Sequence, residues 1–288
     1  MRLRNAVPGL GLLALAAFLL LTPGCSDDSP APVGSNQDPG SPTDPEFLLV
    51  QDQIDDYLDQ FADDVAVGAE NVYQLPTDTE EVRNIYGPMS PDDTVLYTYA
   101  QGWHVVYVSR DNAYFSDYFR DSIQFQDDGL ALEDPDNLDY LHFIRHWGYQ
   151  DNQVDQTHTN RSGHINLEYE NLDTDQASVN GYNNVLVEWN YISDDTTITA
   201  MFNMAVTVEN VILRPVSSYG WINGCPCSGR LTFDMDHSYN LDDGSSNQFV
   251  VRSWTVTVDY DEGYASVRVE RDNEYWTYER QVCSTPTI

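Results

Sequence analysis

The stretch "FVVRSWTVTVDYDEGYASVRVERDNEYWTYERQV", residues 249–282, has the pattern of a β-meander. Large apolar side chains alternate with polar ones in three successive segments, as in strands that bury one face. Two short turns, residues 261–263 and 272–273, separate the segments, and Asp, Asn and Gly tolerate the positive φ of tight hairpins. The residues expected on the buried face are Trp254, Val256, Val258, Tyr260, Ala265, Val267, Val269, Trp276 and Tyr278.

The same texture extends back to about Thr94. Segments rich in Val, Thr, Tyr, Phe and Trp recur at even intervals with turn signals between them, which is typical of an all-β domain. We expect hairpin turns at Asn180-Gly181 and at residues 193–196, and a strand at residues 138–149. The predicted fold class is mainly β: a large curved antiparallel sheet or a β-sandwich, with one N-terminal amphipathic helix packed on it.

That helix is predicted to begin after Asp44. Asp44 suits the N-cap and Pro45 the first helical position. Apolar side chains then recur every three or four residues, so the helix has one apolar stripe that covers the sheet. Gly68 is expected to end it. The stripe consists of Phe47, Val50, Ile54, Leu58, Phe61 and Val65.

The N-terminal 24 residues predict a secretory signal. They combine two arginines, an apolar run and small residues before Cys25. Residues 25–45 are rich in Pro and acids and too poor in apolar side chains to form a core, so they predict a disordered tether. The expected organisation is a signal peptide at 1–24, a lipidated cysteine and tether at 25–45, and a single β-rich domain at 46–288.

The sequence Thr22-Pro23-Gly24-Cys25 resembles the end of a bacterial lipoprotein signal. Such signals usually have a leucine three residues before the cysteine, where this chain has Thr22. The resemblance implies that Cys25 is lipidated and anchors the exported protein to the envelope membrane, at the outer membrane or the cell surface. The alternative is ordinary cleavage after Gly24 without lipidation.

The charge balance narrows the possible partners. All 13 basic residues are arginines, against 47 acids, and the formal net charge is −34. We therefore predict that the chain binds no nucleic acid, because phosphate binding needs a positive surface. The acids are scattered, which favours a soluble, self-repelling surface. No cofactor is predicted, and calcium held by carboxylates remains open as the alternative.

The cysteines other than Cys25 predict a structural disulfide, because thiols outside the cytoplasm tend to oxidise. A bridge from Cys227 to Cys283, or from Cys225 to Cys283, would close a loop of about 57 residues and add ~4 kcal/mol of stability. A Cys225–Cys227 bridge leaves little room for good geometry. A metal clip at these two cysteines would need a further ligand such as His237.

Two further groups are weak metal candidates. His142 and His146 stand four residues apart, a spacing that could hold zinc on a helix but separates the side chains by about 13 Å on a strand. Asp234, Asp236 and Asp242 lie in an acidic stretch that lacks the spacing of a helix-loop-helix calcium site. No catalytic residue is predicted, since the chain has no nucleophile elbow, phosphate loop or dinucleotide fingerprint.

The function expected from these observations is a lipid-anchored binding or structural module of the cell envelope. A curved sheet lined by aromatic side chains could hold an apolar ligand or lipid, or the module could bind an envelope protein. Two alternatives remain open: an extracytoplasmic hydrolase of envelope polymers, and an adhesion or assembly subunit that uses an exposed strand edge.

Overall fold

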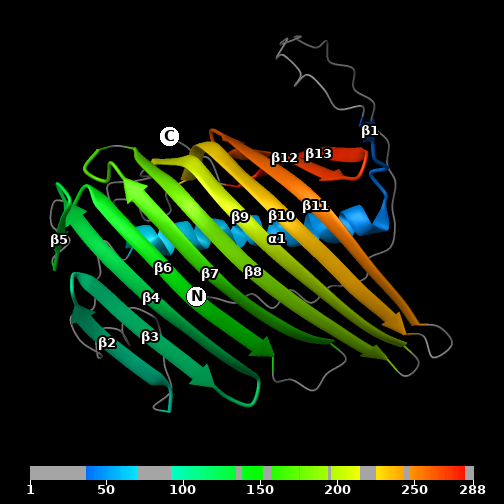
Figure 1. The fold of residues 1–288 in the computed structure, drawn as a ribbon, viewed down its shortest axis with the longest axis horizontal. Helices are drawn as coiled ribbons and strands as arrows, with labels where there is room; N and C mark the ends of the chain where they lie inside the picture. Colours follow the sequence, from blue (N-terminus) through cyan, green and yellow to red (C-terminus); the bar gives the residue numbers. More distant parts are fainter. Residues whose placement is uncertain are drawn as a thin grey trace, which may run out of the picture. The chain divides into compact units, whose positions relative to one another are not determined.

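The computed structural model describes residues 37–70, 92–133, 138–151, 157–174, 176–193, 196–214, 225–242 and 247–282. These residues form one helix and one 13-stranded sheet (Figure 1). The sheet order is β1-β13-β12-β11-β10-β9-β8-β7-β6-β4-β3-β2, with β5 paired to β4. The elements are α1 (Pro45–Glu70), β1 (Asp38–Pro39), β2 (Thr94–Ala100), β3 (Trp103–Asp111), β4 (Phe115–Asp127), β5 (Leu130–Leu132), β6 (Tyr140–Asp151), β7 (Thr157–Glu170), β8 (Ala177–Ser193), β9 (Thr196–Arg214), β10 (Cys225–Asp242), β11 (Asn247–Asp261), β12 (Tyr264–Arg271) and β13 (Glu274–Gln281).

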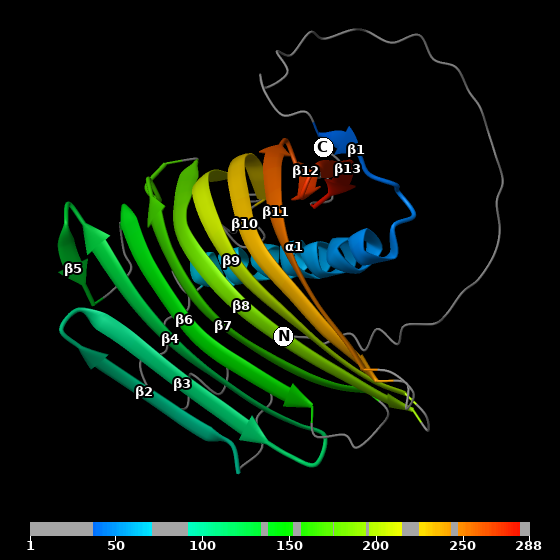
Figure 2. The ribbon, with the colours of Figure 1, turned by 45° about the vertical axis from the view of Figure 1, so that its right-hand side comes forward.

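The prediction of a mainly β fold with a large curved sheet and one N-terminal helix is confirmed. The sandwich alternative is wrong for the described strands, because they all belong to a single sheet. Figure 2 shows this sheet curving around one side of α1, so the helix forms the second layer that a sandwich would have taken from a second sheet. We call the sheet face that contacts α1 the inner face and the opposite one the outer face.

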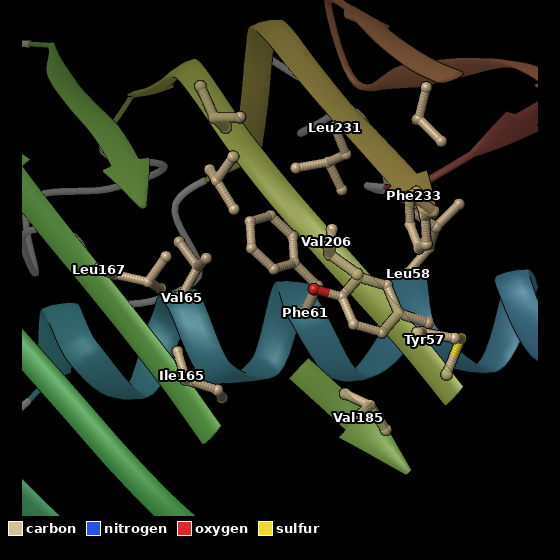
Figure 3. Packing of buried hydrophobic residues seen from close by; sticks show 14 of the residues in the cluster. Tyr57, Leu58, Phe61, Val65, Ile165, Leu167, Val185, Val206, Leu231 and Phe233 are labelled. Atoms are coloured by element: carbon tan, nitrogen blue, oxygen red, sulfur yellow. The ribbon is translucent and has the colours of Figure 1, made fainter. Parts of the chain in front are cut away.

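The core lies between α1 and the inner face. Leu58, Phe61 and Val65 point from the helix toward side chains of the sheet, which include Leu231 and Phe233 (Figure 3). Leu58 and Phe61 each retain 1% of their exposed surface. The apolar stripe predicted for the helix is therefore buried against the alternating apolar positions of the strands, where each square ångström removed from water stabilises by about 25 cal/mol.

The N-terminus of α1 has the predicted cap. The Oδ1 atom of Asp44 accepts hydrogen bonds from the backbone N–H groups of Glu46 and Phe47, at 2.8 and 3.0 Å. The expected end at Gly68 is wrong, since α1 continues to Glu70. Glycine favours a helix end but does not impose one.

A line of backbone irregularities crosses β8, β9 and β10. Asn180-Gly181, expected to be a hairpin turn, instead lies inside β8 at a shift of register with β9. A second irregularity separates β9 and β10 at Gly229. Gly181 and Gly229 have φ angles of 145° and 107°, and a Cβ atom would lie 2.0 and 2.4 Å from a neighbouring carbonyl oxygen. Such bulges bend a sheet, and these lie in the part that curves around α1.

Other predicted local features are confirmed. The segment expected to be a strand at 138–149 is β6. Ser193 pairs directly with Thr196, as in the predicted hairpin. In the C-terminal meander, Glu262 and Asp272 take positive φ angles of 44° and 53° at the two predicted turns. The strand that precedes this meander in sequence, β10, is also its neighbour in the sheet.

The fold begins earlier than the boundary expected at residue 46. Backbone N–H groups of Asp38 and Gly40 donate to the carbonyl oxygens of Asn273 and Tyr275, both at 2.8 Å. The Trp276 indole N–H donates to the carbonyl oxygen of Ser41, also at 2.8 Å. Residues 37–44 therefore cover the β13 edge of the sheet, although their composition predicted a tether.

Candidate functional site

The cysteine predictions fall partly on residues outside the described ranges, which include Cys25 and Cys283. Cys227 is half-buried in β10, and burial raises the pKa of its thiol. Its carbonyl oxygen accepts a hydrogen bond from Glu262 N–H at 2.9 Å, and the next residue of that turn, Gly263, accepts one from Val282 N–H at 3.0 Å. Cys227 and Val282, the residue before Cys283, thus form hydrogen bonds with the same turn. This supports the Cys227–Cys283 pairing, which stays a prediction.

The metal clip that would add His237 to Cys225 and Cys227 is wrong. All three residues belong to the single strand β10, and ten residues of extended chain separate His237 from Cys227 by about 33 Å. The His237 ring is buried and stacked on Phe202 with ring centroids 4.2 Å apart. Burial lowers the pKa of His237, so this histidine is a neutral core residue.

His142 and His146 do not form a pair. Both lie on the outer face of β6, where four residues of strand separate them by about 13 Å. The Nε2 atom of His142 lies 2.8 Å from Asn166 Oδ1 on β7. His146 instead lies directly opposite His164 across the β6–β7 pairing, and sequence spacing alone could not indicate this partner.

Two of the three acidic candidates lie on the outer face of β10. Asp234 and Asp236 are both exposed, and Asp236 Oδ1 accepts a hydrogen bond from Ser253 Oγ at 2.7 Å. The side chain of Asp242 lies outside the described part of the chain. The structure therefore places two of the three carboxylates on one face, and calcium binding there stays a prediction.

A different acidic group forms at the other end of the sheet. Carboxylate oxygens of Asp127, Asp128 and Asp139 lie within 4.8 Å of one another, and Asp128 N–H donates to Asp139 Oδ2 at 3.3 Å. The turn signal Asp127-Asp128-Gly129 located the first two in the sequence, but the approach of Asp139 depends on the pairing of β4 with β6. An exposed group of this kind commonly exists without an ion.

A cluster of charges among the described residues holds α1 to the sheet. Arg271 forms ion pairs with Glu46 and Asp44 at 2.7 and 3.1 Å, while its guanidinium lies 4.7 Å from the ring centroid of Trp254. Further along the helix, Arg280 pairs with Asp59 at 2.6 Å. Cationic side chains from β12 and β13 thus neutralise acids of α1, an arrangement that orients the helix.

Asp55 belongs to the same contact and has a perturbed pKa. Burial raises the pKa of its carboxyl group, against the opposing effect of the nearby Arg280 guanidinium. The Tyr278 hydroxyl donates to Asp55 Oδ1 at 3.2 Å. Perturbed carboxyl groups often mark catalytic sites, but this one already has an arginine and a tyrosine as partners between helix and sheet, and so it is structural.

No protein-family model matches the chain, and neither the curated proteins nor the solved structures contain a significant match. Within the described residues, no helix combines the length and apolar character needed to cross a membrane. The function is therefore inferred from the residues and the geometry of this chain.

Proposed function

We propose that the protein is an exported, lipid-anchored module of the bacterial cell envelope that binds a partner through an exposed surface and catalyses no reaction. One observation carries the choice of an exposed surface: α1 occupies the inner face of the sheet, the side on which a curved sheet could enclose a ligand. The leader and Cys25 support the export and the anchor.

The packing beside α1 favours surface binding over an enclosed apolar ligand. Buried side chains of the helix and the sheet form one apolar cluster, and a small depression lies at its margin, lined by residues that include Gln53, Asp56, Tyr57 and Arg161. An apolar ligand that took the place of α1 on the inner face would have to displace the helix, together with the ion pairs of Arg271 and Arg280.

Lipid anchoring is tested with a Cys25→Ser variant in which a secretory signal that is cleaved without lipidation also replaces residues 1–24. In the native host, we expect the wild-type protein to partition into the detergent phase of Triton X-114 and the variant to remain in the aqueous phase, because the acyl chains are the anchor. Mass spectrometry of the wild-type product should show a diacylated or triacylated N-terminus at Cys25. An intact leader, or detergent partitioning of the variant, would contradict the proposal.

Surface binding is tested on the same aqueous variant. Native mass spectrometry of the Cys25→Ser protein purified from its host should give the mass of the chain without its leader. A stoichiometric apolar adduct would show that the fold encloses a ligand, and it would overturn the preference for an exposed surface.

A second candidate function, assembly by strand addition, is favoured by the edge strand β2. Its sequence "TVLYTYA" contains no charge and no proline, and the exposed fraction of Leu96 is 59%. Edge strands usually carry charged residues or proline, which prevent another chain from pairing with them. At the opposite edge of the sheet, the charged strand β13 is covered by β1. The occupant of choice is a second copy of this chain, because a two-fold axis brings the same strand from both copies together.

Sedimentation velocity of the Cys25→Ser protein, at rising concentration and physiological salt, tests strand addition. We expect a dimer that Leu96→Lys abolishes, since a charge on an edge strand opposes pairing. Leu130→Lys is the matched control, because Leu130 is also exposed but lies on β5. A monomer at every concentration, or equal effects of the two substitutions, would contradict this function.

A further inference from the structure

The outer face of the sheet carries a pair of histidines that meet only through strand pairing. His146 on β6 and His164 on β7 are direct cross-strand partners. Their imidazole rings are stacked, with centroids 4.2 Å apart and planes 9° from parallel. The side chain of His146 is exposed and that of His164 is partly exposed, so an ion in solution can reach both.

The spacing of the two rings fits a shared metal ion. Two metal–nitrogen bonds of about 2.1 Å at a tetrahedral angle separate the two nitrogens by roughly 3.4 Å. The ring centroids are 4.2 Å apart, so one nitrogen of each ring can reach this distance once the side chains rotate. Directly opposite residues of an antiparallel pair have Cβ atoms about 5 Å apart, so rotation of the side chains can turn one nitrogen of each ring toward a common point without moving the backbone.

The surroundings of His164 favour the form of its ring that binds metal. A histidine ligand must be neutral. Burial lowers the pKa of His164, and so does the neighbouring His146. The next residues in this cross-strand row are Arg120, opposite His146, and Asn184, opposite His164. The net charge of −34 raises the concentration of cations near the protein as a whole.

We propose that His146 and His164 together bind a divalent transition-metal ion between β6 and β7, with water in the remaining coordination positions. Imidazole nitrogens favour Cu²⁺, Ni²⁺ and Zn²⁺ over the oxygen-seeking Ca²⁺ and Mg²⁺. The affinity is expected to be highest for Cu²⁺, as the general order of first-row divalent metals requires. Such an ion would link two central strands of the sheet.

In the test, Cu²⁺ is titrated into the metal-free full chain. Isothermal titration calorimetry measures the affinity, and electron paramagnetic resonance identifies the coordinated nitrogens. We expect one principal site per chain, with hyperfine splitting from two imidazole nitrogens. His146→Asn and His164→Asn should each weaken this site at least tenfold, and the double variant should be no weaker than either single variant, because one imidazole cannot chelate alone. Ca²⁺ should give no heat at the same site.

His142→Asn is the matched control, because His142 lies on the same face of the same strand but contacts Asn166 rather than another histidine. It should retain wild-type affinity within twofold. Circular dichroism of the metal-free variants verifies that each is folded. The proposal is overturned if the three single substitutions weaken binding equally, if His146→Asn leaves the affinity unchanged, or if the spectrum shows fewer than two coordinated imidazoles.

Discussion

The inner and outer faces of the sheet alternate along the same strands but differ in what surrounds each side chain. On β10, the inner residues Leu231, Phe233 and Met235 are buried in the core, whereas the outer residues Asp234 and Asp236 are exposed. The backbone of a strand directs both sets of side chains outward in the same way, so the difference in burial arises from α1, which covers one face only. Stability is therefore expected to depend on the inner face, and recognition on the outer face and the edge strand β2.

The largest effect is expected where the helix meets the inner face. Leu58→Ala should lower the free energy of unfolding by about 2–5 kcal/mol, because it removes a buried side chain and leaves a cavity. Leu48→Ala makes the same chemical change on the same helix, at a side chain that is 44% exposed, and should cost less than about 1 kcal/mol. Urea unfolding followed by tryptophan fluorescence measures both. Equal costs would show that α1 does not close the core.

The bulges that curve the sheet come next. Gly181→Ala and Gly229→Ala should each cost about 1–3 kcal/mol, because an L-residue at these φ angles is strained and its Cβ atom meets a carbonyl oxygen. Thr207→Ala, on the exposed outer face of β9, is the control and should change stability by less than about 0.5 kcal/mol. The same unfolding experiment compares them, and a glycine variant as stable as the control would mean that the curvature tolerates a side chain there.

The sequence predicted the faces of the strands but not the relations between distant strands. Alternation assigned Trp254, Val256 and Val258 to one buried face correctly, because that period is a local property of the chain. It could not distinguish one curved sheet from a sandwich, since both bury one face of each strand. The Asn-Gly pair at residues 180–181 also led to a wrong prediction of a hairpin turn, where the strand bends instead of reversing.

The candidate sites show the same limit. The partner of His146 is His164, eighteen positions along the chain, and their meeting depends on the register of β6 and β7. Register is fixed by the whole hydrophobic pattern and by the hairpin connections, so no short motif contains it. The helix cap at Asp44, in contrast, involves neighbouring residues and was predicted from them.

A smaller, pH-dependent effect is expected at that cap. Burial opposes ionisation of Asp44, but hydrogen bonds from Phe47 N–H and from Arg271 outweigh it and lower the pKa of the carboxyl group. A lowered folded-state pKa means that the charged group stabilises the fold fully above its unfolded pKa, and that this contribution is lost as the pH falls through the folded-state pKa. Asp44→Ala should cost about 1 kcal/mol at neutral pH, as for other N-caps.

Asp44→Asn separates the cap from the charge, because asparagine also caps helices well. The variant should be less stable than wild type at pH 7. This deficit should shrink as the pH falls toward about 3, because the wild-type carboxylate then becomes protonated. Denaturant unfolding of both proteins across this range is the measurement. A deficit that grows on acidification would have the wrong sign for a lowered pKa.

The smallest effect is expected from an ion pair on the outer face. Arg230 and Asp259 form two hydrogen bonds, at 2.7 and 3.1 Å, but their side chains are 52% and 51% exposed. Solvent screens such a pair, so breaking it should cost only about 0.2–1 kcal/mol. The high negative charge of the chain adds an asymmetry: Arg230→Gln makes the net charge more negative, whereas Asp259→Asn makes it less so.

Arg230→Gln should therefore destabilise the protein more than Asp259→Asn, although both substitutions break the same pair. Salt screens repulsion between exposed charges, so the difference should close at about 1 M NaCl, where the Debye length is about 3 Å. Urea unfolding of both variants at low and high salt measures the gap. A difference that persists in salt would assign it to local packing of the arginine side chain on the outer face, and the outer face would then contribute to stability through contacts as the inner face does.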